Sequence, residues 1–173
     1  MHGAKPMVIC GHIASRDRSE IYKVDFEDRI MCLKVITDDR RFDITYEEAY
    51  TNYFAFKQTV QYQSGLFVDV YRAWRDECGK FFILMEYLQP DLWKRIEYGK
   101  TDTGILIAEN LLMQAGYFMV DFAPINFLRC GKRIKMVDMD TLTRIEKYPE
   151  DPQEAIPELA WYGSRVLKYR KQG

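Results

Sequence analysis

Three polar side chains in the second half of the chain have the types and spacing needed to handle a phosphate group. Asp121 and Asn126 lie five residues apart in a segment expected to link a helix to a strand, and Asp138 ends an apolar run. A loop amide and a strand-end carboxylate can converge on one Mg²⁺ ion, while a separate carboxylate faces an incoming hydroxyl. The set predicts phosphoryl transfer, with Asp121 as the catalytic carboxylate and Asn126 and Asp138 as metal ligands.

Each of these residues also has an ordinary structural explanation. Asp121 could cap a turn, since an Asp followed closely by Pro is common turn chemistry. Asn126 could bond a nearby backbone group, and Asp138 could mark a plain exit from a strand. Their order along the chain favours the functional interpretation.

The composition of the chain argues against some binding partners and some kinds of catalytic site. The chain has 173 residues, 47% of them hydrophobic, and a formal net charge of -1. It can therefore bury a core, and it has no global basic field that would favour nucleic acid or an anionic membrane. His2 and His12 are the only histidines, so we expect neither a histidine-based triad nor a mononuclear zinc site. Scattered cysteines and short apolar runs predict a soluble cytoplasmic or other intracellular protein.

The first half of the chain alternates strands with one helix. The β-rich runs Ile21–Val24 and Arg29–Ile36 predict one hairpin, and Phe67–Trp74 with Phe81–Leu88 predicts a second. Between the hairpins, Tyr46–Phe54 has apolar residues at helical spacing. We expect an antiparallel sheet with one helix.

The second half changes character after Pro90. Gly104–Ala115 predicts a helix that ends at Gly116, Phe127–Val137 predicts two short strands around a turn, and Glu158–Tyr169 predicts a last helix. The candidates for the N-cap of the Gly104–Ala115 helix are Thr101, Asp102 and Thr103.

Several segments resemble motifs of the protein-kinase family, and they occur in the family's order between about Ile9 and Thr143. Asp121–Asn126 resembles the catalytic loop, and Asp138–Asp140 takes the place of the D-F-G motif. Met31–Lys34 resembles the strand that carries the nucleotide-binding lysine, and Met85–Leu88 resembles the strand that enters the hinge.

The resemblance implies ATP with Mg²⁺ or Mn²⁺, bound between two lobes. It places adenine against the hinge backbone at Glu86 and Leu88, and Lys34 on the α- and β-phosphates. The remaining positions that it assigns to ATP are Met85, Ser19 and Ile21. Lys34 needs an acidic partner, and we expect Glu47, with Glu48 as the alternative, because the positions three and seven after Glu47 are apolar.

The chain also departs from the family pattern. Met119 and Val120 replace the usual His-Arg before the catalytic Asp, so activation by loop phosphorylation is not expected. Ala123 stands where serine/threonine kinases usually have a lysine. The three glycine positions of the phosphate loop are occupied by Ala14, Arg16 and Ser19.

The predicted fold is therefore α+β and bi-lobed, with an N-lobe at 1–88 and a reduced, mostly helical C-lobe at 89–173. It resembles the miniature kinases that some pathogenic bacteria deliver into host cells. We expect a protein kinase that acts on a protein hydroxyl, most readily that of Ser or Thr, with a partner protein that supplies docking or activation. One alternative is a pseudokinase that binds nucleotide or protein, and another is a small-molecule kinase.

Overall fold

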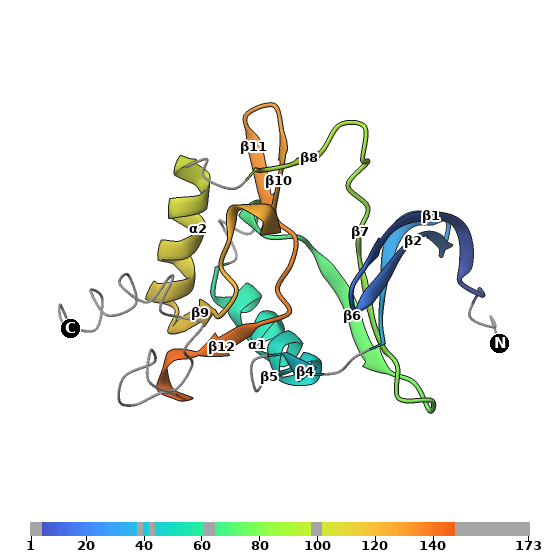
Figure 1. Ribbon diagram of the computed structural model, residues 1–173, viewed down its shortest axis with the longest axis horizontal. Coiled ribbons are helices and arrows are strands. Elements are labelled where there is room, and N and C mark those ends of the chain that lie inside the picture. Colours follow the sequence, from blue (N-terminus) through green and yellow to red (C-terminus); the bar gives the residue numbers. More distant parts are fainter. Residues whose placement is uncertain (1–4, 38–39, 42–43, 61–64, 98–101, 148–173) are drawn as a thin grey trace. The chain divides into compact units, whose positions relative to one another are not determined.

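The computed structural model describes residues 5–37, 40–41, 44–60, 65–97 and 102–147. It is an α+β protein with a five-stranded antiparallel sheet and, in these ranges, two α-helices (Figure 1). The chain forms two compact units: unit 1 comprises 1–39 and 68–92, and unit 2 comprises 40–67 and 93–173. The units do not follow the single division predicted after Leu88, because the segment with the first helix belongs to unit 2. Neither described helix is long and apolar enough to cross a membrane.

Unit 1 is built on the five-stranded sheet, whose order is β1-β2-β3-β7-β6. Its strands are β1 Val8–Arg16, β2 Ser19–Phe26, β3 Arg29–Ile36, β6 Val70–Arg75 and β7 Phe81–Glu86. Both predicted hairpins are confirmed. In the turn between β2 and β3, Glu27 and Asp28 have φ angles of 52° and 61°. A two-residue hairpin turn that follows the twist of its strands requires positive φ at both central residues.

The pairing of β2, β3 and β7 puts defined rows of side chains on each face of the sheet. Ile21 lies opposite Lys34, and Lys34 lies opposite Ile83; Cys32 and Met85 form part of the next row. Directly opposed residues share a face, and alternate residues along a strand return to it. The opposite face is closed by a hydrophobic cluster of Val24, Met31, Leu33 and Leu84.

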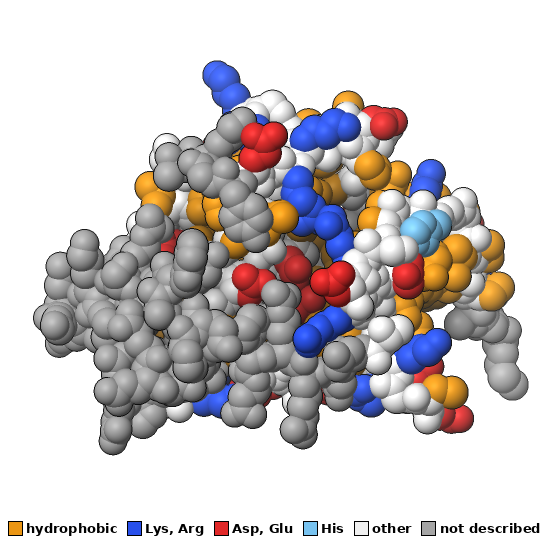
Figure 2. All heavy atoms as spheres, in the orientation of Figure 1, with side chains coloured by type: hydrophobic (Ala, Val, Ile, Leu, Met, Phe, Trp, Pro, Cys, Tyr) orange, Lys and Arg blue, Asp and Glu red, His pale blue; other side chains and the backbone are white. Residues whose placement is uncertain are grey.

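Strand β1 forms one edge of the sheet. Val8 and Ile9 are 54% and 58% exposed, and Figure 2 shows hydrophobic surface over β1 and β2 at the right of the view. The pairing of β1 with β2 shifts register between Ile9 and Gly11 and again between His12 and Ala14. Such irregularities twist an edge strand and make it a poorer template for another strand.

Unit 2 combines both helices with short strands. Its elements are β4 Arg40–Arg41, β5 Ile44–Thr45, α1 Tyr46–Thr59, β8 Lys94–Arg95, α2 Thr103–Gln114, β9 Tyr117–Met119, a 3-10 turn Pro124–Asn126, β10 Phe127–Cys130, β11 Arg133–Met136, β12 Leu142–Arg144 and a 3-10 turn Ile145–Lys147. The sheets pair β11-β10-β8, β12-β9 and β4-β5. In residues 93–147 the expectation of a mostly helical lobe is wrong, because α2 is the α-helix there and the other elements are strands and short turns.

The core of unit 2 includes an aromatic group on α1. Phe56 is fully buried, and its ring lies 4.8 Å from that of Phe67 and 5.8 Å from that of Tyr117. Phe67 also forms an isolated parallel bridge with Met136. The prediction that Phe67 begins the second hairpin is therefore wrong: the ring is buried in unit 2, and β6 starts at Val70. Burial of Phe56 also explains why α1 continues beyond the predicted end at Phe54.

Helix α2 confirms one of the three proposed caps. The Asp102 carboxylate accepts a hydrogen bond from the Gly104 backbone N–H at 2.7 Å and forms an ion pair with Arg129. A Cβ on Gly104 would lie 2.4 Å from Cδ1 of Ile134, so a larger residue there would require the Ile134 side chain to move. Gly116, at φ +85°, follows the helix as predicted. The helix expected over Glu158–Tyr169 lies outside the described residues.

Candidate functional site

The segments that carry Asp121, Asn126 and Asp138 are joined within unit 2 by hydrogen bonds that their backbone N–H groups donate. The N–H of Val137 donates to the carbonyl of Asn126 at 2.8 Å, which places Asn126 beside the residue before Asp138. On the other side, the N–H of Asp121 donates to Oγ1 of Thr141 at 3.1 Å. The two segments therefore meet both before and after the predicted catalytic and metal positions.

The side chain of Asn126 is oriented by one hydrogen bond. Its Nδ2 donates to the carbonyl of Asp121 at 2.5 Å. A carbonyl can only accept, so the amide nitrogen must face Asp121 and Oδ1 must be the atom offered elsewhere. Asn126 is 5% exposed, and its place follows from the 3-10 turn at Pro124–Asn126. This orientation is the one a cation ligand needs, because a metal binds the amide oxygen.

Asp138 and Asp140 have different environments, although both follow the same strand. Asp138 is partly exposed, and its Oδ1 accepts a long hydrogen bond of 3.4 Å from the N–H of Asp140. Asp140 is 5% exposed, and its Oδ1 accepts a 2.8 Å hydrogen bond from the hydroxyl of Tyr50. Solvent access favours Asp138 over Asp140 as a ligand for a diffusible metal nucleotide.

Together, Asn126 and Asp138 fit a hard cation in chemical type. They offer one amide oxygen and one carboxylate, and a phosphate-bound Mg²⁺ commonly takes few protein ligands and completes its shell with phosphate and water oxygens. Among the residues the structure describes, no group of three or more His, Cys, Asp or Glu side chains could hold a metal.

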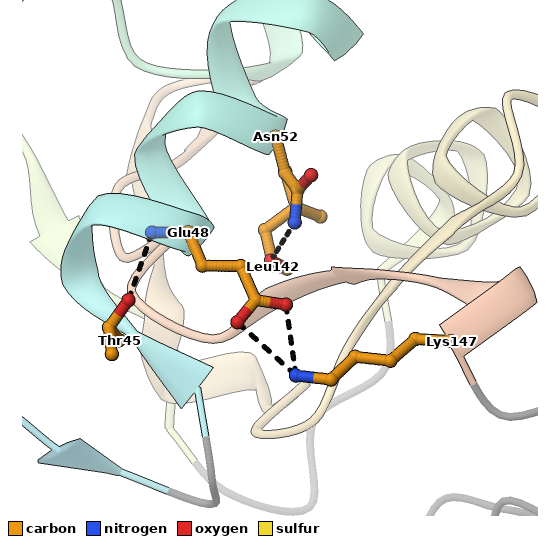
Figure 3. A network of polar contacts seen from close by, with 5 residues as sticks. All are labelled: Thr45, Glu48, Asn52, Leu142 and Lys147. Atoms are coloured by element: carbon orange, nitrogen blue, oxygen red, sulfur yellow. Dashed lines mark hydrogen bonds and ion pairs between the residues drawn. The ribbon is translucent and has the colours of Figure 1, made fainter.

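Helix α1 is joined to the chain that follows Asp138 (Figure 1; Figure 3). Asn52 donates from Nδ2 to the carbonyl of Leu142 at 3.0 Å. Glu48 forms an ion pair with Lys147, with Nζ 3.0 Å and 3.2 Å from its two carboxylate oxygens. The helix begins at the Thr45 cap, whose Oγ1 accepts from the Glu48 N–H. Sequence reasoning missed these contacts, since nothing in the pattern links α1 to residues 90 or more positions later.

In unit 1, the predicted nucleotide residues share one face of the sheet. Ser19, Ile21, Lys34 and Met85 all belong to rows on the face opposite the hydrophobic cluster. Lys34 is 8% exposed. The register thus brings together side chains from three strands that the resemblance assigned to ATP.

The predicted hinge begins where β7 leaves the ladder. Glu86 is the last residue of β7; its N–H donates to the carbonyl of Asp69, and its Oε1 accepts from the Asp69 N–H. These two bonds fix the end of the strand, and Leu88 follows outside it, half-buried. The predicted strand end at Leu88 is therefore two residues too far.

The predicted phosphate loop is a tight hairpin turn between β1 and β2. Arg16 pairs directly with Ser19, and the carbonyl of Arg18 accepts from the Thr37 N–H at 3.1 Å. A two-residue turn tied to β3 is a stiffer element than a glycine-rich loop. Nothing in it offers the close backbone approach that glycines permit.

A serine, histidine and glutamate cluster joins β1 to β2 beside this turn. His12 Nε2 lies 2.7 Å from Glu20 Oε2 and 3.2 Å from Ser15 Oγ, and Ser15 donates to Glu20 at 2.8 Å. In a nucleophilic triad the serine and the carboxylate use different ring nitrogens. Here both use Nε2, so the cluster braces the hairpin. Hydrogen bonds from His12 and Ser15 lower the pKa of Glu20.

Lys34 and its predicted partner lie in different units. Lys34 is on β3 of unit 1, and Glu47 is on α1 of unit 2, with an exposed side chain. Glu48, the alternative, is paired with Lys147. Pairing of Lys34 with Glu47 stays a prediction, and Glu48 is already engaged within unit 2.

Cys32 gives a chemical test of the sheet face that carries Lys34. Burial raises the pKa of its thiol to about 11, although the nearby Lys34 ammonium opposes this. Thiolate is the reactive form, so at pH 8 we expect iodoacetamide to modify Cys32 about 100-fold more slowly than the exposed Cys10 and Cys78. Peptide mass spectrometry over time measures the three rates.

Labelling in urea is the control, because the three cysteines should then react at similar rates. If native Cys32 reacts as fast as Cys78, the face is more open to solvent than the structure indicates.

Comparison with models of known protein families and with curated protein sequences gives no match.

Proposed function

We propose that this protein is an ATP-dependent protein kinase with a bi-lobed, kinase-like fold, and that it transfers the γ-phosphoryl group to a serine or threonine hydroxyl of a protein. Asp121 orients that hydroxyl and accepts its proton. The acceptor oxygen bonds to the γ-phosphorus, the bond to the bridging oxygen breaks, and ADP leaves with the electron pair. Lys34 binds the α- and β-phosphates, and adenine binds the backbone at Glu86 and Leu88.

One observation carries the proposal. The Asp121–Asn126 segment and the Asp138 segment are bonded to each other at Val137–Asn126 and at Asp121–Thr141. These bonds join the segment of the proposed proton acceptor to the segment of the proposed metal ligand Asp138, and the three residue types are the set that phosphoryl transfer uses. A bound Mg²⁺ would neutralise phosphate charge, and Asn126 and Asp138 would hold it. The shared face of Ser19, Ile21, Lys34 and Met85 adds support from unit 1.

A pseudokinase is the second candidate. It is favoured by the β1–β2 hairpin, where Ala14, Arg16 and Ser19 occupy the three glycine positions of the phosphate loop. A turn that is held by hydrogen bonds and has no glycine suits a protein that binds nucleotide but does not turn it over rapidly.

The test is transfer of label from γ-labelled ATP with Mg²⁺ or Mn²⁺, using the full chain alone and with cell extract. We expect a labelled protein band that falls at least about 100-fold for Asp138→Ala, the loss typical when one group that stabilises transition-state charge is removed. Asp91→Ala, at an exposed site in unit 1, is the matched control and should retain transfer.

Two other results would reject the proposal in favour of an alternative, and a third would reject the role of Asp138. Nucleotide binding without transfer, even with extract, identifies a pseudokinase. Label found only on a small metabolite identifies a small-molecule kinase. Equal transfer by Asp138→Ala and the wild type removes Asp138 from the site.

A further inference from the structure

Helix α1 carries a tyrosine whose hydroxyl reaches the segment after Asp138. Tyr50 is 2% exposed, and its hydroxyl donates to Oδ1 of Asp140 at 2.8 Å. The carboxylate is itself 5% exposed. Burying a carboxylate is costly unless it is hydrogen-bonded, and a hydrogen bond to a charged acceptor is stronger than a neutral one. The position of Asp140 therefore depends on α1.

Asp140 in turn contacts the proposed metal ligand through its own backbone. Its N–H donates to Oδ1 of Asp138 at 3.4 Å. The N–H of Leu142 donates to the carbonyl of Met139 at 3.2 Å, so the chain turns tightly just after Asp138. Met139 and Thr141 are buried on either side of Asp140. A displacement of Asp140 would therefore move the group that contacts the Asp138 carboxylate.

The hydroxyl of Tyr50 stays a donor over the pH range of ordinary assays. Burial raises the pKa of Tyr50 well above its usual value, and the Asp140 and Asp138 carboxylates raise it further. Since the phenol remains protonated, its bond to Asp140 persists wherever Asp140 is ionised.

We propose that Tyr50 is a positioning residue for the metal site: by holding Asp140, it fixes the turn that aims the Asp138 carboxylate. The bonds from Asn52 to Leu142 and from Glu48 to Lys147 fasten the same helix to the same stretch of chain. Asp140 stands where the resembling motif has glycine, which has no side chain to receive such a bond. The metal-binding role rests on the proposed kinase function; the coupling between α1 and residues 138–142 does not.

The test is Tyr50→Phe, which removes one hydroxyl and keeps the ring. We expect faster hydrogen exchange at the amides of residues 138–142, and about 10-fold weaker binding of Mn²⁺ in the presence of ADP, as is typical when a group behind a metal ligand is lost. If transfer occurs, the Mg²⁺ concentration for half-maximal rate should rise by a similar factor, with the KM for the acceptor protein unchanged.

Tyr117→Phe is the matched control. Tyr117 is also a buried tyrosine of unit 2, and its hydroxyl makes no hydrogen bond to another described residue. The control should change neither exchange at residues 138–142 nor Mn²⁺ binding.

Two results would overturn the inference: unchanged exchange at residues 138–142, or faster exchange with unchanged Mn²⁺ affinity, which would make Tyr50 purely structural. If Tyr50→Phe does not fold, the double variant Tyr50→Phe/Asp140→Ala also removes the buried carboxylate, and weak Mn²⁺ binding is still expected. A wild-type chain that binds Mn²⁺ with ADP but transfers no phosphate would reject the proposed function and leave the inference intact.

Discussion

Asp121→Asn is expected to lower the rate of phosphoryl transfer by about 10²- to 10⁴-fold, the range for loss of a positioned acid or base. The amide has nearly the shape of the carboxylate, but it cannot accept the proton of the acceptor hydroxyl. ATP affinity should change little, because Asn126 and Asp138 remain. Initial rates at saturating ATP and Mg²⁺, together with ATP binding by calorimetry, measure the two effects separately.

The substitution should leave the local backbone in place. Two of the bonds at this position are made by the backbone of Asp121, to the Thr141 hydroxyl and from the Asn126 amide, and the substitution keeps both groups. Asp91→Asn, at an exposed site, makes the same chemical change elsewhere and should retain full activity. A variant at Asp121 that keeps more than half of the wild-type rate would show that another group accepts the proton.

The sequence predicted those elements whose signals are local. The β2–β3 hairpin follows from two β-rich runs around a polar turn, and α2 follows from an apolar run between Asp102 and Gly116. The core of α1 was also predicted, since Tyr46, Ala49, Tyr50 and Tyr53 recur at helical spacing and are all buried.

Other elements have no local signal. Strand β1 contains His12, Ser15 and Arg16, and its pairing is interrupted twice, so no clean alternation marks it as a strand. Phe67 was assigned to β6 by composition alone, yet its bridge is to Met136. Such pairings depend on residues far apart in the sequence, which hydrophobic periodicity does not report.

The candidate site also has features that the local sequence predicts and features that depend on residues far apart in the chain. The spacing of Asp121, Asn126 and Asp138 identified the residues, and the structure adds how two of them are held. The sequence also allows Asn126 to bond a nearby backbone group; it does so, through Asp121, and that bond fixes which end of its amide carries the oxygen. Tyr50 was predicted only as core, because a buried hydroxyl and its partner 90 residues later leave no pattern in the sequence.

The second large effect is expected at Lys34. Lys34→Met removes the ammonium and keeps an unbranched chain that suits a buried site, since Lys34 is 8% exposed. If the ammonium binds the α- and β-phosphates, kcat/KM for ATP should fall at least about 100-fold, as for other groups that stabilise phosphate charge. Affinity for ATP should fall, whereas affinity for adenosine should stay the same, because adenosine has no phosphate. Calorimetry with both ligands separates these effects.

Lys80→Met is the matched control, because Lys80 is an exposed lysine in the turn before β7 of the same unit. It should change neither affinity. If Lys34→Met also lost adenosine binding, the substitution would have disturbed the sheet face itself. Nucleotide binding would then depend on the register of Ile21, Lys34 and Ile83. Unchanged ATP affinity would remove Lys34 from the site. Lys34 is in unit 1 and Asp121 is in unit 2. If Lys34→Met weakened ATP binding and Asp121→Asn slowed phosphoryl transfer, the two units would have to act on one nucleotide.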